Sequence, residues 1–189
     1  VKGYPANLLK GQEIELDCFQ TVASGAISKN LIQVFYTSEA LKKESGIAEE
    51  VDPLDIQHAS VLGAGVMGGG IAWLFSHKNF NVRMKDITWD ALAKGYQAAA
   101  AVYEQLRKRR RYKPNEISVK MHKISGGLDY TNFNHTDLVV EAVVENMEIK
   151  KKVLAETETH LSDNAILASN TSSLSITEMA SALKRPEKF

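Results

Sequence analysis

The sequence has little of what several common classes of protein require. Only one of its 189 residues is a cysteine, Cys18, which excludes a disulfide framework and fits a reducing compartment. Its 23 basic residues balance 23 acidic ones, and this zero net charge argues against a nucleic-acid-binding surface. The uncharged stretch 61–76 is rich in glycine and shorter than the roughly 18 apolar residues of a membrane span. We therefore predict neither a nucleic-acid partner nor a transmembrane segment.

The beginning of the chain also lacks the apolar core of a signal peptide. Because the chain starts with Val1 rather than Met, we expect that Val1 is not the native first residue of the protein. Residues 1–50 have only helical patterns, over 13–28 and near 38–43. Two or three helices cannot easily bury a core alone, so we expect this part to pack on something else. The acidic stretch at 47–57 indicates a linker.

Beyond the linker, short apolar runs alternate with helical patterns. This alternation predicts an α/β fold over residues 55–189, with a doubly wound parallel sheet that is covered by helices on both faces. The expected strands are 56–62, 81–85, 123–125, 137–143 and 165–169, and the expected helices are 66–77, 89–111, 145–161 and 175–183.

The turn after the first predicted strand carries Gly63, Gly65 and Gly68 in the pattern G-x-G-x-x-G. With a strand before it and a helix after it, this pattern is typical of a Rossmann-type dinucleotide-binding domain. The first glycine permits the tight turn, the second lets a pyrophosphate approach the backbone, and the third lets the helix lie close to the sheet. The alternative is a glycine-rich turn with a purely structural role.

The second predicted strand ends at Asp86, 23 residues past Gly63 and close to the spacing of roughly 20 for the acid that holds the adenosine ribose. A carboxylate there accepts hydrogen bonds from both ribose hydroxyls and repels a 2′-phosphate, so Asp86 favours NAD over NADP. The alternative is that Asp86 caps the helix that starts near Trp89, although Thr88 could be the cap instead.

In two later segments, 137–146 and 168–174, a predicted strand runs into polar residues at its carboxyl end. Ligands bind at the carboxyl ends of the strands in open parallel sheets, so these polar residues are candidate site residues. The alternative is that Asn146 and Ser172 each start a helix as its cap.

The chain resembles the L-3-hydroxyacyl-CoA dehydrogenase family in three strings, 61–72 (VLGAGVMGGGIA), 137–146 (DLVVEAVVEN) and 168–173 (ASNTSS). The resemblance is closest to the alpha subunits of multifunctional fatty-acid β-oxidation complexes, in which an enoyl-CoA hydratase half precedes the dehydrogenase half. It implies that residues 55–189 form an NAD-binding Rossmann domain that is incomplete at its C-terminus. Residues 1–50 would be a helical tail and linker from the end of the hydratase domain.

The resemblance also implies which residues hold the cofactor. Those at its pyrophosphate and adenosine ribose would be Gly63, Gly65, Met67, Gly68 and Asp86. Those near its nicotinamide side would be Val143, Val144, Glu145, Lys150, Asn170 and Ser172. Ser172 would also contact the acyl substrate near the reacting oxygen. The alternatives are a solvated helix face for Lys150, which lies in a run of three lysines, and plain core for Val143 and Val144.

In this family the long helix after the second strand ends in basic residues near the CoA, and Arg107, Lys108 and Arg109 occupy that region. An arginine fork suits phosphate binding. The alternative is a solvated helix end, because cations near a helix C-terminus are favoured in any case.

The implied reaction oxidises an L-3-hydroxyacyl-CoA to a 3-ketoacyl-CoA and passes a hydride to NAD, with a histidine as the base. The family's histidine lies in a His-Phe-Phe-Asn-Pro segment, which we expect a few residues beyond Phe189. None of the five histidines present has that context; they are His58, His77, His122, His135 and His160. We therefore predict no catalytic residue and no metal site within the chain, and no turnover by the chain alone.

For the whole protein, the resemblance implies a thiolase beta subunit as partner and, in a bacterium, a cytoplasmic location; in a eukaryote the organelle stays open. Two other functions also stay open. One is a dehydrogenase for another hydroxyacid, which the N-terminal tail disfavours because such relatives normally begin near the glycine turn. The other is a non-catalytic nucleotide-binding or interaction module.

Overall fold

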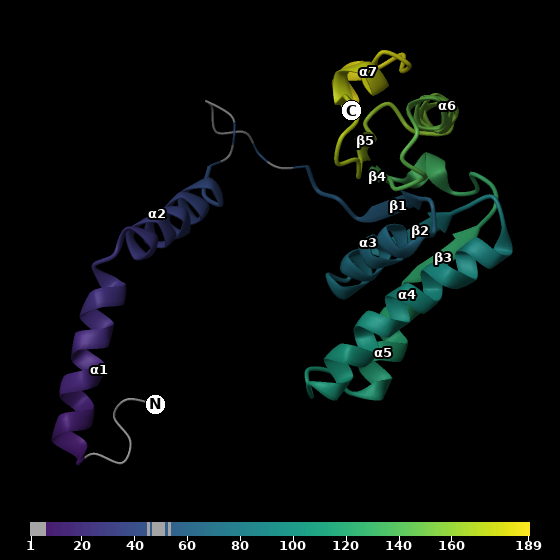
Figure 1. The fold of residues 1–189 in the computed structure, drawn as a ribbon. Helices are drawn as coiled ribbons and strands as arrows, with labels where there is room; N and C mark the ends of the chain where they lie inside the picture. The colour runs from purple at the N-terminus through teal and green to yellow at the C-terminus, as the bar shows by residue number, and fades with distance from the viewer. Residues whose placement is uncertain (1–6, 45, 47–51, 53) are drawn as a thin grey trace. The chain divides into compact units, whose positions relative to one another are not determined.

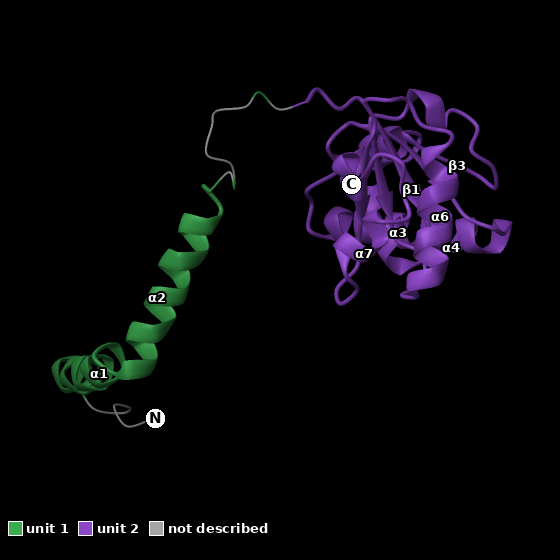
Figure 2. Cartoon of the chain, turned by 90° about the horizontal axis from the view of Figure 1, so that it is seen from above, with its two compact units in different colours: residues 1–53 green, residues 54–189 purple. Residues whose placement is uncertain are grey.

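The computed structural model describes residues 7–44, 46, 52 and 54–189. The chain divides into two compact units, Val1–Pro53 and Leu54–Phe189 (Figure 2). The predicted linker at 47–57 falls partly outside the described residues.

The first unit consists of two helices, α1 (Leu8–Ala23) and α2 (Ala26–Leu41), and none of their described residues is buried. The helix predicted over 13–28 is wrong in its bounds, because the chain leaves the helical conformation near Gly25, the extended N-cap of α2. The helix expected near 38–43 is the last part of α2. The apolar spacing continues from α1 into α2, so it predicts a single helix there, and only Gly25 marks the break between the two.

The second unit is built on a sheet of five parallel strands in the order β3-β2-β1-β4-β5 (Figure 1). The order extends in opposite directions from β1, which is the doubly wound arrangement and confirms the predicted Rossmann-type α/β fold. The strands are β1 (His58–Leu62), β2 (Asn81–Lys85), β3 (Ile124–Gly127), β4 (Leu138–Glu141) and β5 (Ile166–Ser169).

The helices of this unit are α3 (Val66–His77), α4 (Trp89–Lys108), α5 (Pro114–Met121), α6 (Met147–Glu158) and α7 (Ile176–Ala180), with short 3-10 turns at Phe133–His135 and Pro186–Lys188. The predicted helix 89–111 ends earlier, at Lys108, and Arg110 takes a left-handed φ of 56°. Helix α5 has no counterpart among the predicted helices; it begins with Pro114 at its first turn and with Glu116 accepting a hydrogen bond from the Lys113 N–H.

Each face of the sheet has its own apolar core. On one face, Val61, Val82 and Met84 pack with Ala72 of α3 and Leu92 of α4. The second core is built around residues of β4, β5, α6 and α7, among them Val139, Leu167, Leu154 and Met179. The carboxyl ends of the five strands therefore share one edge of the unit, from which α3, α4, α6 and α7 depart; we call it the carboxyl edge. Among the described residues, no helix combines the length and the apolar character that crossing a bilayer requires.

Candidate functional site

The turn from β1 into α3 is packed so closely that two of its glycines leave no room for a side chain. Gly63 has a φ of +90°, and a Cβ on it would lie 2.5 Å from the carbonyl oxygen of Ala142, just after β4. A Cβ on Gly68 would lie 1.9 Å from the carbonyl oxygen of Gly63. Steric fit alone thus requires both glycines, which supports the structural roles given to them by the motif.

Gly65 differs from these two, because a Cβ on it would meet nothing within 4 Å. It is the N-cap of α3 and lies at the surface, as do Val66 and Met67 of the first turn. Within the described part of the chain, no side chain caps this helix. The first amides of α3 therefore face an open surface with the positive end of the helix dipole, and this arrangement fits a pyrophosphate.

Asp86 follows β2 and lies beside the same turn. Its Oδ2 accepts a hydrogen bond from the Ala64 N–H at 2.6 Å, and its Oδ1 accepts one from the Ile87 N–H at 2.6 Å. Each oxygen keeps a further lone pair for a ribose hydroxyl. The capping alternative for Asp86 is wrong, because the N-cap of α4 is Thr88, whose Oγ1 accepts the Ala91 N–H at 3.2 Å.

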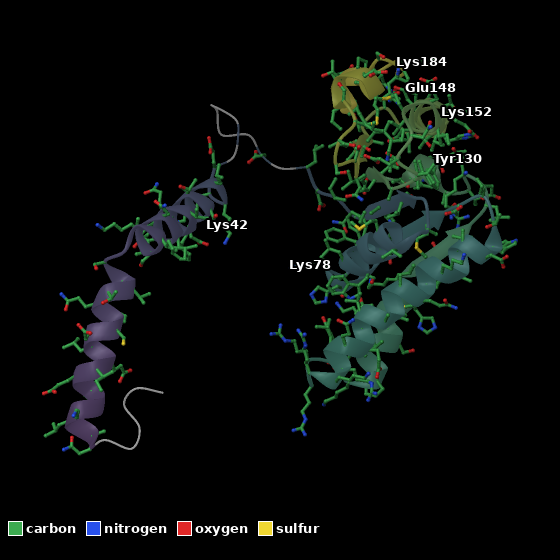
Figure 3. The ribbon with its side chains drawn as sticks, viewed as in Figure 1. Lys42, Lys78, Tyr130, Glu148, Lys152 and Lys184 are labelled. Atoms are coloured by element: carbon green, nitrogen blue, oxygen red, sulfur yellow. The ribbon has the colours of Figure 1, made fainter. Side chains whose placement is uncertain are left out.

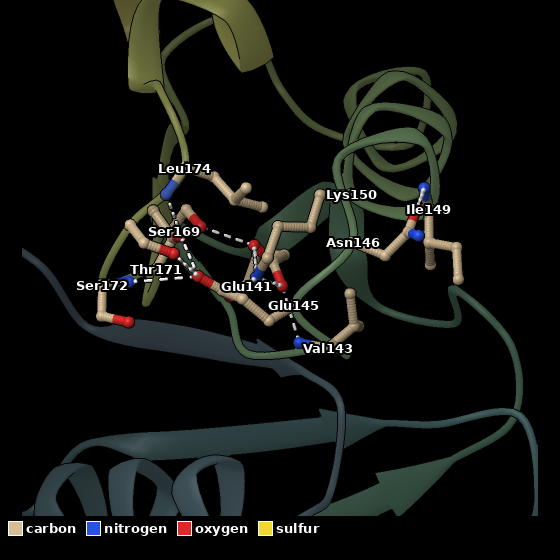
Figure 4. A network of polar contacts seen from close by, with 11 residues as sticks. Glu141, Val143, Glu145, Asn146, Ile149, Lys150, Ser169, Thr171, Ser172 and Leu174 are labelled. Atoms are coloured by element: carbon tan, nitrogen blue, oxygen red, sulfur yellow. Dashed lines mark hydrogen bonds and ion pairs between the residues drawn. The ribbon is translucent and has the colours of Figure 1, made fainter.

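A buried ion pair lies at the end of β4 (Figure 4). The Lys150 Nζ donates to both carboxylate oxygens of Glu141, at 2.8 and 2.9 Å, and both side chains have an exposure of 0%. Glu141 also accepts the Val143 N–H at 2.6 Å and the Ser169 hydroxyl at 2.5 Å. The alternative of a solvated helix face for Lys150 is therefore wrong.

The same ammonium reaches Glu145 in the loop after β4. The Lys150 Nζ lies 3.2 Å from Glu145 Oε2, and the Glu145 side chain is 40% exposed. Glu145 Oε1 accepts hydrogen bonds from the Thr171 hydroxyl at 2.5 Å and the Ser172 N–H at 3.3 Å. The Thr171 hydrogen bond above all, together with Lys150 and the Ser172 amide, lowers the pKa of Glu145 to about 2. Glu145 is thus an ionised carboxylate that joins the loops after β4 and β5.

The other residues implied by the resemblance lie at the same edge. Val143 packs against the second core, whereas Val144 is 62% exposed, so the plain-core alternative is wrong for Val144. Asn170 and Ser172 are exposed in the loop after β5. Capping occurs at Asn146, whose Oδ1 accepts the Ile149 N–H, but α7 is capped by Ser175 rather than by Ser172. This leaves the exposed Ser172 hydroxyl without a capping role.

Comparison with known proteins decides the family. Residues 58–189 match the model of the family described as 3-hydroxyacyl-CoA dehydrogenase, NAD binding domain. The chain belongs to this family. NAD is accordingly its cofactor.

The fatty acid oxidation complex subunit alpha of Ectopseudomonas oleovorans is 41% identical over 180 residues, which are 95% of this chain and 25% of that protein. Its counterpart in Pseudomonas putida F1 is 40% identical over the same shares. Among solved structures, (S)-3-hydroxybutyryl-CoA dehydrogenase from Ralstonia eutropha has a TM-score of 0.69 at 35% identity, over 71% of this chain and 48% of that one. The chain thus spans about a quarter of the length of the curated relatives, and the match to them includes most of the helical unit.

For a 3-hydroxyacyl-CoA dehydrogenase domain, the placement of the histidines matters, and all five lie away from the carboxyl edge. His58 begins β1. His77 is the last residue of α3 and His160 comes two residues after α6, so both lie at the helix end that is away from that edge. His122 and His135 shortly precede β3 and β4. Each therefore lies near the amino end of a strand, where it cannot act on a ligand at the opposite edge.

The basic residues Arg107, Lys108 and Arg109 are not brought to the carboxyl edge either. They end α4, whose 20 residues extend about 30 Å from the cap beside Asp86. Arg107 forms a two-pronged hydrogen bond with Glu104, at 2.6 Å for each contact, and both side chains are partly exposed. This geometry favours the solvated helix end over CoA binding for these residues.

Proposed function

We propose that the chain forms the NAD-binding part of a dehydrogenase that oxidises L-3-hydroxyacyl-CoA to 3-ketoacyl-CoA in fatty-acid β-oxidation. The observation that carries the proposal is the convergence at one edge of an open glycine turn, the Asp86 carboxylate and the Glu145–Ser172 contact. When bound, NAD supplies the acceptor for the substrate's hydride.

In this proposal the residues of the chain bind and orient. The amides at Gly65, Met67 and Gly68 hold the pyrophosphate, and Asp86 holds the ribose while its charge repels a 2′-phosphate. Val143, Val144 and Glu145 lie along the nicotinamide side. Lys150 belongs to the same side, and its ammonium lies 3.2 Å from Glu145 Oε2.

Ser172 lies between the cofactor and the acyl substrate, where its exposed hydroxyl can hydrogen-bond the reacting oxygen, and Asn170 lies close by on the cofactor side. The proton of the substrate hydroxyl requires a base near neutral pKa at this edge. The five histidines lie near the amino ends of the strands, so the base comes from another part of the whole protein.

The assignment of the whole protein rests on the first unit as well. Its helices fall within the match to fatty acid oxidation complex alpha subunits, which supports residues 1–50 as the end of an enoyl-CoA hydratase domain and 55–189 as the NAD-binding domain. For the whole protein we further propose a thiolase beta subunit as partner and, if the protein is bacterial, a cytoplasmic location.

Titration of the 189-residue chain with NAD tests the binding site. Asp86→Ala removes two hydrogen bonds to the ribose, and we expect the NAD dissociation constant to rise about ten- to a hundredfold. Asp90→Ala, which removes an exposed carboxylate in the first turn of α4, is the matched control and leaves binding unchanged. Equal affinity in wild type and Asp86→Ala would refute the ribose role, and a gain in NADP binding by Asp86→Ser would support it.

Turnover by the whole protein tests the reaction. We expect NAD reduction with 3-hydroxyacyl-CoA, and comparison of long with short acyl chains separates a β-oxidation enzyme from a dehydrogenase for another hydroxyacid. Absence of turnover with every acyl-CoA would leave a non-catalytic binding module as the better description.

A further inference from the structure

Glu141 is fully buried at the carboxyl edge, and each of its carboxylate oxygens accepts two hydrogen bonds. Its Oε1 accepts the Val143 N–H at 2.6 Å and the Lys150 ammonium at 2.8 Å. Its Oε2 accepts the same ammonium at 2.9 Å and the Ser169 hydroxyl at 2.5 Å (Figure 4). One buried carboxylate thus links the loop after β4, the first turn of α6 and the end of β5.

Stability alone does not account for this pair. The removal of two charges from water costs about as much free energy as their attraction returns, and apolar residues of similar size often serve as well. A role beyond stability is indicated by the third member, since Lys150 also lies 3.2 Å from the partly exposed Glu145. The ammonium therefore joins a fully buried carboxylate to one at the surface of the edge.

We propose that Glu141 is a positioning residue for NAD: by fixing Lys150 and the Val143 amide, it holds Glu145 and the loop after β4 in the binding arrangement. The inference rests on the proposed nicotinamide-side role of Val143, Val144 and Glu145. In this arrangement Lys150 acts on the loop through its contact with Glu145.

The physical basis is the freedom that Glu141 removes. A lysine side chain has many rotamers, and an ammonium without a fixed partner turns toward water. The Lys150 Nζ donates two charged hydrogen bonds to Glu141, which hold it in one place, from which it contacts Glu145. The Val143 N–H fixes the start of the loop on the same carboxylate.

The test compares two variants with a matched control. Glu141→Gln leaves the buried ammonium with Glu145 as its carboxylate partner, whereas the double variant Glu141→Gln/Lys150→Met removes both buried charges and is expected to fold, since neutral replacements of buried pairs are often tolerated. Glu158→Gln is the control. Glu158 is also nearly buried on α6 and accepts the N–H groups of Lys184 and Arg185, but it lies at the far end of the helix.

We expect the NAD dissociation constant to rise about tenfold or more in both Glu141 variants, the cost of one charged contact. It should stay at the wild-type value in Glu158→Gln, even if that variant melts at a lower temperature. In the folded double variant, carboxyl NMR should also report a pKa of Glu145 above its wild-type value of about 2, because Lys150 contributes to the lowering.

Wild-type NAD affinity in the folded double variant, or an unchanged titration of Glu145, overturns the inference and leaves the pair a purely structural role. If Glu141→Gln does not fold, the double variant decides alone. Asp86→Ala separates this failure from failure of the proposed site, because it tests NAD binding at the other half of the edge, away from Glu141.

Discussion

The two halves of the carboxyl edge are built by opposite means. Around the turn between β1 and α3, the site depends on side chains that are absent: Gly63 and Gly68 allow the backbone to close on itself, and Gly65 leaves the surface open. Around the ends of β4 and β5, it depends on charged side chains, with Lys150 between Glu141 and Glu145. We refer to these as the glycine half and the charged half.

The difference determines what each half can tolerate. Space is the constraint in the glycine half, where a single methyl group added to Gly63 or Gly68 meets a carbonyl oxygen. The backbone amides of the turn do not titrate, so their charge does not change with pH. Charge balance is the constraint in the charged half, because every buried charge there has a partner of opposite charge. Loss of that partner would leave an unpaired charge in an apolar environment.

The largest effect is expected when the charged half loses its balance. Lys150→Met leaves Glu141 as an uncompensated buried carboxylate, so the free energy of unfolding should fall by about 3–5 kcal/mol, measured by urea denaturation. Lys152→Met is the matched control on the same helix. Lys152 is exposed on α6 (Figure 3), and its replacement should change stability by no more than about 0.5 kcal/mol. Similar losses in the two variants would contradict the importance of charge balance.

The glycine half should break on added volume instead. Gly68→Ala places a methyl group 1.9 Å from the Gly63 carbonyl oxygen, which should lower the free energy of unfolding by about 1–3 kcal/mol and weaken NAD binding as α3 shifts. Gly70→Ala, two residues along the same helix, meets nothing within 4 Å and should be neutral or stabilising by up to about 1 kcal/mol. Thermal melts of both variants provide the measurement, and a tolerated Gly68→Ala would show that the turn has room to spare.

The same contrast explains what could be predicted from the sequence. The glycine half is local: a strand, three glycines and Asp86 lie within one strand–helix–strand unit, and their spacing is set by that unit. The predicted bounds of α3 and β2 are correct, because turn residues close to each element in the sequence mark where it begins and ends.

The charged half is not local. Glu141 is nine residues from Lys150 and 28 from Ser169, and it lies within an apolar strand where its own neighbours give no sign of a partner. The only signal available was the unusual position itself, an acidic residue ending a run of buried apolar ones, because such a residue needs a buried partner. Lys150 on α6 supplies that partner, and only the structure reveals it. In the first unit, apolar spacing located helices but gave no sign of the break at Gly25.

The smallest effect is the response of the charged half to acid. The folded-state pKa of Glu145 is about 2, below its ordinary value of 4.5, so its ionised form contributes stability above pH 4.5, and this contribution is lost as the pH falls towards 2. The difference in unfolding free energy between wild type and Glu145→Gln should therefore stay constant from pH 5 to 8 and shrink below pH 4.5. The methyl group added by Gly68→Ala meets the backbone of Gly63 and the side chain of Val61, none of which titrates, so the difference between wild type and Gly68→Ala should keep its size over the same range. A Glu145 difference that does not change down to pH 3 would mean that the contacts from Thr171 and Lys150 do not hold this carboxylate in its charged form.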